Sequence, residues 1–232
     1  MATRAALKSR LKRRLLPEGA APRTIRAGLL SGLRMDLDFQ HRTQLWLGLQ
    51  ERELLRWIRS LSKDIRTAID VGANDGMYTL YFLAKTRAVN TIAFEPSVDD
   101  LLQLRRNLAL NQLAEDLRLQ IVPQFVGAVA GPDATTLDAY SDSLLSPCLI
   151  KVDIDGGEVE LLRGARKTLS LSDVRWIIEV HSKELEEQCI DILRHANYRV
   201  QLVPNAWWRA LLPELRLIGH NRWLVATPKG RP

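Results

Sequence analysis

Four side chains that can bind hydroxyls, hold metal ions or accept protons stand at the ends of short apolar segments in this chain. Glu95 follows one such segment, Asp153 follows a second, and Glu179 and His181 lie at the end of a third. Apolar segments of this length are typical of buried parallel strands, whose carboxyl ends meet at one edge of a sheet and bind ligands there. We therefore expect these four side chains to share one site.

A glycine-bearing turn is predicted at the same edge. The apolar strand 67–72 leads into Gly72-Ala-Asn-Asp-Gly76, where glycine lets the backbone approach a ligand closely. Glu95 lies 19 residues beyond Gly76, near the offset of about 20 at which an acidic side chain binds ribose hydroxyls. The turn is not Gly-x-Gly-x-x-Gly, so a pyrophosphate dinucleotide fits poorly. A nucleoside without phosphates, such as S-adenosylmethionine, fits better, and this predicts a methyltransferase.

The third apolar segment supplies the candidate general base. His181 ordinarily titrates near neutrality, and Glu179, two residues earlier on the strand, faces the same side. Asp153 is a carboxylate at a buried strand end, which is costly unless it is paired or used. Asp153 and Glu179 also offer hard oxygen ligands for Mg²⁺; the alternative is two carboxylates held by hydrogen bonds without a metal.

Two further segments near these residues can be explained by structural roles as well as by functional ones. Asp155 and Glu158 precede or begin a predicted helix, where Asp155 would cap and Glu158 would gain from the helix dipole. The segment 205–208 contains two adjacent tryptophans, which either form an apolar wall over an acceptor or simply pack.

The elements that must position these residues alternate strand with helix. This alternation predicts an α/β fold with a seven-stranded, mostly parallel sheet, helices on both faces and an antiparallel last strand. The expected strands are 67–72, 90–95, 118–126, 148–153, 174–180, 198–203 and 222–227, and the expected helices are 76–86, 97–111, 157–169 and 182–196.

The chain ahead of the first sheet strand is expected to have two parts. Residues 1–22 form a basic N-terminal extension, and residues 23–66 form a cover for the Rossmann-like core at 67–232. Within the cover, residues 24–39 suggest a hairpin or irregular segment. Apolar residues from Leu45 to Leu61 recur at helical spacing and predict a helix against the sheet.

Charge is unevenly spread along the chain. The net charge is +6, and residues 1–14 carry six basic side chains and no acidic one. We interpret this segment as a solvated terminal helix; the alternative is attachment to an anionic membrane face or to nucleic acid. No aromatic residue interleaves with the basic ones, so we expect no nucleic-acid partner.

Composition is that of an ordinary globular protein. Hydrophobic residues make up 46% and charged residues 26% of the 232 residues, which suits one α/β domain. Cys148 and Cys189 have no metal-ligand spacing and are expected to be buried, reduced thiols of a cytoplasmic protein. No apolar run approaches the roughly 18 residues of a membrane span, and no signal peptide is recognisable, which argues against secretion.

The ordered set of segments resembles the FkbM family of S-adenosylmethionine-dependent methyltransferases. The resemblance spans roughly residues 24–200. It rests on Ile69-Asp-Val-Gly-Ala-Asn-Asp-Gly-Met-Tyr-Thr79, Phe94-Glu-Pro96, Thr136-Leu-Asp138, Ile150-Lys-Val-Asp-Ile-Asp-Gly-Gly-Glu158, Leu162-Arg-Gly-Ala165 and Glu179-Val-His181.

This resemblance implies a class I methyltransferase fold and O-methylation of a hydroxyl on a sugar or secondary metabolite. Glu95 would bind the ribose, and Asp153, Glu179 and His181 would face the acceptor as catalytic residues. The cofactor-binding residues would be Asp70, Gly72, Asn74, Gly76, Glu95 and Pro96. The family more often has Glu-Gly-Ala where this chain has Asp155-Gly-Gly157.

Other readings of the same residues remain open at this point. A non-catalytic binding module would retain the cofactor fold and recognise a partner. A nicotinamide-dependent oxidoreductase is disfavoured by the glycine pattern of the turn. A nucleic-acid methyltransferase is disfavoured because no Asn/Asp-Pro-Pro-Tyr segment stands at the position of Asp153.

Overall fold

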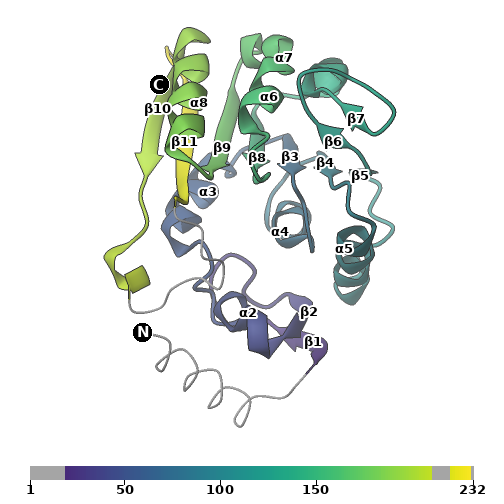
Figure 1. Cartoon of the computed structure of the whole chain (residues 1–232). Coiled ribbons are helices and arrows are strands. Elements are labelled where there is room, and N and C mark those ends of the chain that lie inside the picture. The colour runs from purple at the N-terminus through teal and green to yellow at the C-terminus, as the bar shows by residue number, and fades with distance from the viewer. Residues whose placement is uncertain (1–18, 211–219, 231–232) are drawn as a thin grey trace.

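A seven-stranded sheet forms the centre of the protein (Figure 1). The computed structural model describes residues 19–210 and 220–230, without the side chains of residues 208 and 210. The strand order is β10-β11-β9-β8-β3-β4-β5, and β11 is antiparallel to both of its neighbours, as predicted. The strands are β3 (Thr67–Val71), β4 (Asn90–Phe94), β5 (Leu119–Val122), β8 (Cys148–Val152), β9 (Val174–Val180), β10 (Tyr198–Val203) and β11 (Arg222–Pro228).

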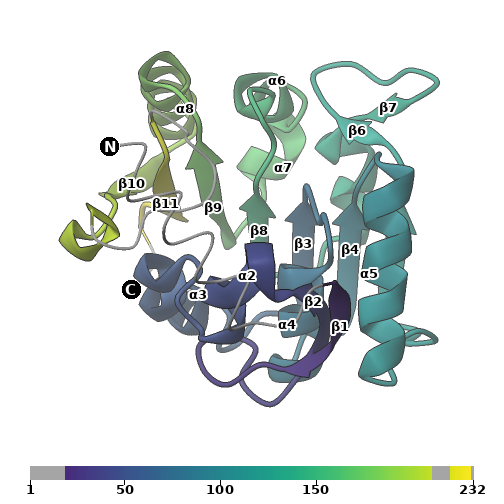
Figure 2. The same cartoon turned by 60° about the horizontal axis from the view of Figure 1, so that its bottom comes forward.

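Helices cover both faces of this sheet, which confirms the predicted fold class (Figures 1 and 2). Because strand side chains alternate between faces, Ala68 joins one apolar layer while Ile69 and Val71 join the other. One face carries α3 (Leu55–Leu61), α4 (Met77–Lys85) and α5 (Val98–Leu110), and the other carries α6 (Glu158–Arg163), α7 (Arg166–Ser170) and α8 (Lys183–His195).

Two predicted elements are divided in the structure. The expected strand 118–126 breaks at Pro123 into β5 and β6 (Phe125–Val126), and β6 pairs with β7 (Ala134–Thr135) outside the main sheet. The expected helix 157–169 divides into α6 and α7 around Gly164. A Cβ at Gly164 would lie only 3.0 Å from the carbonyl carbon of Gly127, so the break lets two backbones approach closely.

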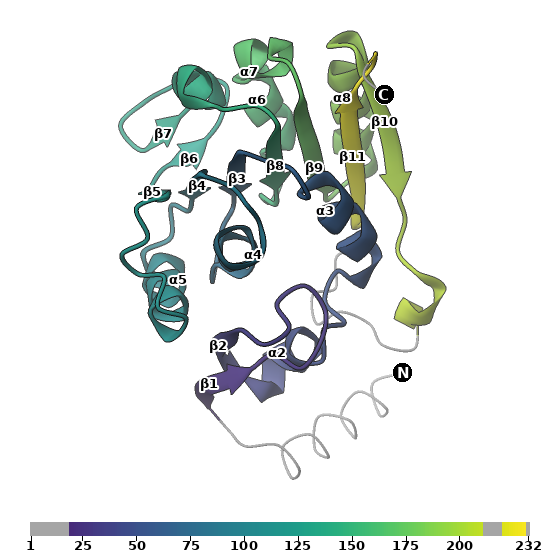
Figure 3. The ribbon, with the colours of Figure 1, turned by 180° about the vertical axis from the view of Figure 1, so that it is seen from behind.

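The cover lies on the α4 side of the sheet (Figure 3). It consists of the antiparallel pair β1 (Ala20–Thr24) and β2 (Arg34–Asp38), then α2 (Phe39–Trp46), the 3-10 turn η1 (Arg52–Leu54) and α3. The single helix predicted over residues 44–61 is wrong. Gly48 and Glu51 have φ values of 71° and 45°, and a left-handed backbone ends a helix.

Both cysteines are buried free thiols in the structure. Among the described residues, no helix is both long and apolar enough to cross a membrane. The basic segment 1–18 lies outside the described residues. The remaining short elements are η2 (Leu137–Ser143) and η3 (Trp207–Ala210).

Candidate active site

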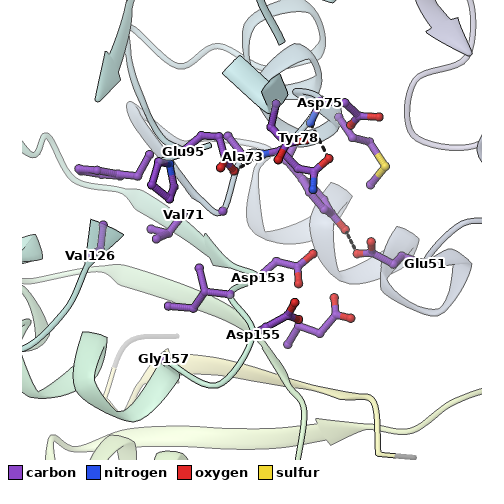
Figure 4. A pocket seen from close by; sticks show the side chains of 18 of the residues that line it. Glu51, Val71, Ala73, Asp75, Tyr78, Glu95, Val126, Asp153, Asp155 and Gly157 are labelled. Atoms are coloured by element: carbon purple, nitrogen blue, oxygen red, sulfur yellow. Dashed lines mark hydrogen bonds between the residues drawn. The ribbon is translucent and has the colours of Figure 1, made fainter. Parts of the chain in front are cut away.

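A cavity of about 630 Å³ opens at the carboxyl ends of the parallel strands (Figure 4). Gly72 after β3, Glu95 after β4, Asp153 after β8 and Glu179 on β9 all line it. In Figure 4, Glu95 lies toward one end of the cavity, and Asp153 lies with Asp155 and Glu51 toward the other. The structure therefore brings together residues from separate segments of the sequence and places them at two ends of one cavity.

The turn after β3 supports the end near Glu95. Gly72 has φ +79°, and a Cβ there would overlap the carbonyl oxygen of Asp153 and lie 2.9 Å from its carbonyl carbon. Gly76, with φ +88°, ends the turn just before α4. Gly72 requires a residue without a side chain because the backbone of Asp153 passes directly against it, whereas Gly76 has a left-handed backbone and faces the side chain of Leu104 on α5.

The N–H groups of this turn already have acceptors within the chain. Gly72 and Ala73 both donate to the carbonyl oxygen of Phe94, at 3.0 Å each, and Gly76 donates to the carbonyl oxygen of Ala73. Asn74 donates to Oε2 of Glu95 at 2.8 Å. A pyrophosphate site needs such N–H groups turned toward the ligand, so this turn is poorly suited to a dinucleotide.

Glu95 is a buried carboxylate fixed by two backbone donors. Its Oε2 accepts from Asn74 and its Oε1 accepts from the N–H of Ser97 at 2.9 Å. A carboxylate has about four lone-pair sites, so two directions are left for hydroxyl donors. The fixed orientation and the remaining acceptor capacity suit recognition of two vicinal hydroxyls. Pro96, the next residue, also lines the cavity.

Asp70 lies one layer behind the turn, fully buried within β3. Its Oδ2 accepts a hydrogen bond from the hydroxyl of Thr79 at 2.6 Å. Burial raises the pKa of Asp70 to about 6, although the Thr79 hydrogen bond and the charge of Lys151 lower it in part. Asp70 does not line the cavity, so it can affect a ligand only indirectly, by holding α4 and the turn in position.

We expect Asp70→Asn to stabilise the protein at high pH. The raised pKa means that the folded state binds this proton more tightly than the unfolded state, so ionisation above pH 6 costs the folded state up to roughly 3 kcal/mol. The cost is absent below about pH 4, where both states are protonated. Urea unfolding of both proteins at several pH values should show a gain for the variant that shrinks as the pH falls. A difference that does not change with pH would contradict this account.

Behind the other end of the cavity, whose wall His181 itself does not form, a buried carboxylate holds the imidazole of His181. Its Nδ1 lies 2.7 Å from Oε1 of Glu158, which is completely buried in the first turn of α6. The His181 side chain is 10% exposed, and its Nε2 has no hydrogen-bond partner. Glu158 therefore orients the imidazole so that Nε2 faces the carboxylates of the cavity.

Those carboxylates surround Nε2 of His181 on one side. Oδ1 of Asp153 and Oε1 of Glu179 each lie 3.8 Å from it, and Oδ1 of Asp155 lies 3.4 Å from it. Burial acts to lower the pKa of His181, but the Glu158 hydrogen bond and the nearby carboxylates outweigh it and raise this pKa. Burial raises the pKa of Glu179 to about 7, with Asp153 adding to the shift.

Lys151 holds the opposite oxygens of two of these carboxylates. Its Nζ lies 3.6 Å from Oδ2 of Asp153 and 3.6 Å from Oε2 of Glu179, and the side chain is 0% exposed. Trp223 also donates to Oε2 of Glu179, at 3.0 Å. Each of the two carboxylates is thus fixed through one oxygen while its other oxygen faces His181.

The cover supplies part of the cavity wall, which the sequence did not predict. Glu51, placed by the left-handed backbone that ends the expected helix, accepts a hydrogen bond from the hydroxyl of Tyr78 on α4 (Figure 4). Arg42 on α2 forms an ion pair with Asp75 of the turn. Both contacts join segments that are distant in sequence, so no local pattern points to them.

Three further expectations turn out differently. Asp155 does not cap α6: the helix N-cap is Gly157, without a side-chain cap hydrogen bond. Glu158 is not merely a helix initiator, because its carboxylate holds His181. Trp207 does not form a wall over the cavity, since its side chain is 82% exposed. The side chain of residue 208 lies outside the described part of the chain.

Comparison with known families agrees with the position of these residues. Residues 125–200 match the family described as the Methyltransferase FkbM domain. This region contains β8 and β9 and therefore Asp153, Glu179 and His181. No curated protein sequence matches the chain.

Solved methyltransferase structures share the fold. The FkbM methyltransferase of Methylobacillus flagellatus KT superposes with a TM-score of 0.54 and 19% identity over 71% of this chain and 44% of that one. The METTL16 methyltransferase domain gives a TM-score of 0.56 with 16% identity over 86% and 75% of the two chains. The precorrin-6y C5,15-methyltransferase of Geobacter metallireducens GS-15 gives 0.52 with 14% identity over 78% and 88%.

Of these three names, that of the precorrin-6y enzyme alone states what the protein acts on, so the likeness extends to the fold and not to an acceptor. The present chain spans less than half the length of the Methylobacillus protein. Residues 125–200 therefore match an FkbM methyltransferase domain, and the chain has the fold of S-adenosylmethionine-dependent methyltransferases.

Proposed function

We propose that the protein transfers the methyl group of S-adenosylmethionine to a hydroxyl oxygen of a small acceptor, a sugar or a secondary metabolite. The observation that carries this proposal is the division of one cavity into two ends. Glu95 and the glycine turn lie at one end, and Asp153 and Glu179 line the other, with Nε2 of His181 3.8 Å behind an oxygen of each. A bisubstrate methyl transfer needs such a division, because donor and acceptor must meet between two separate binding regions.

The first end is assigned to the cofactor. Glu95 would accept the ribose hydroxyls, with Pro96 beside it, and Gly72, Asn74 and Gly76 would shape the space for the methionine portion. Asp70 would keep α4 and the turn in place through Thr79. The N–H groups of the turn have acceptors within the chain, which favours a nucleoside over a nicotinamide dinucleotide.

The second end is assigned to the acceptor. Glu51, Asp153, Asp155 and Glu179 all line this part of the cavity. Carboxylates and an imidazole accept hydrogen bonds from hydroxyls, whereas a phosphate backbone brought near them would be repelled. A small hydroxylated acceptor therefore fits this end better than a nucleic acid does.

In the proposed reaction, the acceptor oxygen attacks the sulfonium methyl in line with the breaking C–S bond. An O–C bond forms, the C–S electron pair stays on sulfur as S-adenosylhomocysteine, and the hydroxyl proton leaves to the acceptor-side groups. The methyl donor is already activated, so alignment of oxygen, carbon and sulfur supplies much of the catalysis, in favourable cases about 7–11 kcal/mol. We assign Asp153, Glu179 and His181 to orienting the hydroxyl, and the acceptor-side groups as a set, which include Asp155, to removing its proton.

Methyl transfer to candidate acceptors tests this proposal. The purified chain is incubated with radiolabelled S-adenosylmethionine and separate pools of sugars, phenolic metabolites, RNA and protein. We expect label only in the hydroxylated small molecules, and we expect the product to be an alkali-stable ether. Label in RNA or protein would show that the acceptor is a macromolecule and would contradict the proposed small-molecule acceptor. Cofactor binding without label in any pool would favour a non-catalytic binding module.

A further inference from the structure

The three acceptor-side residues have the arrangement of a metal site. Nε2 of His181 lies 3.8 Å from an oxygen of Asp153 and 3.8 Å from an oxygen of Glu179, and the three donor atoms all lie within 4.8 Å of one another. Ligands bound about 2.0–2.2 Å from one ion lie roughly 3–4 Å apart. Small side-chain rotations would therefore bring all three donors onto a common ion.

The imidazole of His181 already has the environment of a metal ligand. Its side chain is nine-tenths buried, and Nε2 faces the carboxylates without a hydrogen-bond partner. Its Nδ1 is held at 2.7 Å by Glu158, a completely buried carboxylate. A carboxylate on the far nitrogen fixes the tautomer and ring orientation of metal-ligating histidines and strengthens the nitrogen that faces the ion.

The two carboxylates are supported in the same way. Lys151 and Trp223 bind their rear oxygens, Oδ2 of Asp153 and Oε2 of Glu179. The front oxygens, Oδ1 and Oε1, are the two that face Nε2 of His181. Because every candidate ligand is oriented from behind by a buried partner, the three donor atoms face a common point.

We infer that Asp153, Glu179 and His181 bind one divalent first-row transition-metal ion, which receives the acceptor hydroxyl. The inference rests on the proposed function, because it concerns the acceptor end of the same cavity. Mg²⁺, which the two carboxylates alone would suggest, prefers an octahedron of oxygens, whereas an imidazole ligand favours ions such as Mn²⁺, Fe²⁺ or Zn²⁺.

The ion changes the role of His181. Bound through Nε2 and held through Nδ1, the imidazole has no nitrogen left to take a proton, so it is a ligand in place of the predicted general base. An ion held by these residues would lower the pKa of a coordinated hydroxyl. The proton would leave to water past Asp155, whose carboxylate lies 3.4 Å from Nε2 of His181 and is 75% exposed. The oxygen, left with its electron pair, would then attack the methyl carbon as the C–S bond breaks.

Direct binding of Mn²⁺ tests the inference without any acceptor. Free Mn²⁺ is followed by its electron paramagnetic resonance signal while it is titrated into the full chain with S-adenosylhomocysteine present. We expect one ion per chain, with micromolar affinity and displacement by Mg²⁺ only at millimolar concentration. His181→Asn, which keeps a donor for Glu158 but lacks Nε2, should weaken binding at least ~30-fold. Asp100→Asn removes a carboxylate from elsewhere in the same cavity and should bind Mn²⁺ like the wild type.

Failure of Mn²⁺ to bind, or equal binding by wild type and His181→Asn, would overturn the inference. Asp153→Asn provides a second ligand variant, and thermal unfolding of each variant checks that it is folded. Calorimetry with S-adenosylhomocysteine on the same samples separates the two claims. Cofactor binding without Mn²⁺ binding would overturn the metal site alone, whereas Mn²⁺ binding without cofactor binding would leave the metal site and overturn the proposed function.

Discussion

Replacing His181 by asparagine is expected to lower the rate of methyl transfer by a factor of about 10²–10⁴ while the affinity for S-adenosylhomocysteine changes by less than about threefold. The rate falls because Nε2, the nitrogen that faces Asp153 and Glu179, is lost. The cofactor affinity persists because Glu95 and the glycine turn lie at the other end of the cavity. Steady-state rates with an acceptor found by the screen, together with calorimetry, measure the two effects.

The matched control is His195→Asn. His195 lies at the end of α8, where its Nδ1 contacts the carbonyl oxygen of Asp191, and it does not line the cavity. This variant should keep both the rate and the cofactor affinity. Turnover within about threefold of the wild type in His181→Asn would remove His181 from the acceptor-side chemistry in either role, base or ligand.

Gly72→Ala is expected to abolish cofactor binding and to lower the free energy of unfolding by about 3 kcal/mol or more. The added Cβ would overlap the backbone carbonyl of Asp153, and backbone cannot move aside as a side-chain tip can. Relief of this overlap has to push β3 and β8 apart at the point where both strands deliver residues to the cavity. Urea unfolding and calorimetry on the same preparation measure the two losses.

The variant Gly156→Ala distinguishes the cost of steric overlap at an added Cβ from the cost of a left-handed backbone. Gly156 also has a positive φ, +89°, but a Cβ there meets nothing within 4 Å. Its expected cost is therefore only that of a left-handed non-glycine residue, about 1 kcal/mol. Equal destabilisation of the two variants would contradict the view that close approach of Asp153 is what requires glycine at position 72.

The core of the fold could be predicted because buried parallel strands and amphipathic helices leave local patterns. The alternation of short apolar runs with helical periodicity predicted the seven strands of the sheet and the order of the helices, although the expected strand 118–126 and helix 157–169 are each divided in two. The cover was harder, because apolar residues keep helical spacing across residues 44–61 although the backbone turns left-handed at Gly48 and Glu51. Periodicity reports which side chains are buried, and it does not report such a break.

The site was predicted in part for the same reason. Strand ends point to Glu95, Asp153 and Glu179 because the position of a strand end can be inferred locally. Glu158 was assigned to helix initiation, and only the tertiary structure shows that its carboxylate is buried against His181. The contacts of Lys151 could have been predicted from the sequence, because a lysine inside a buried apolar strand requires negatively charged partners. In the structure these partners are Asp153 and Glu179.

The central claim is that the turn after β3 and Glu95 form the site of a nucleoside cofactor. The most direct measurement is calorimetric titration of the purified chain with S-adenosylhomocysteine, with NAD⁺ and NADH as controls. We predict micromolar binding of S-adenosylhomocysteine, none of either dinucleotide, and a loss of about 100-fold in Glu95→Ala, where the charged acceptor for the ribose is removed. Preference for a dinucleotide, or S-adenosylhomocysteine binding that does not depend on Glu95, would contradict this assignment.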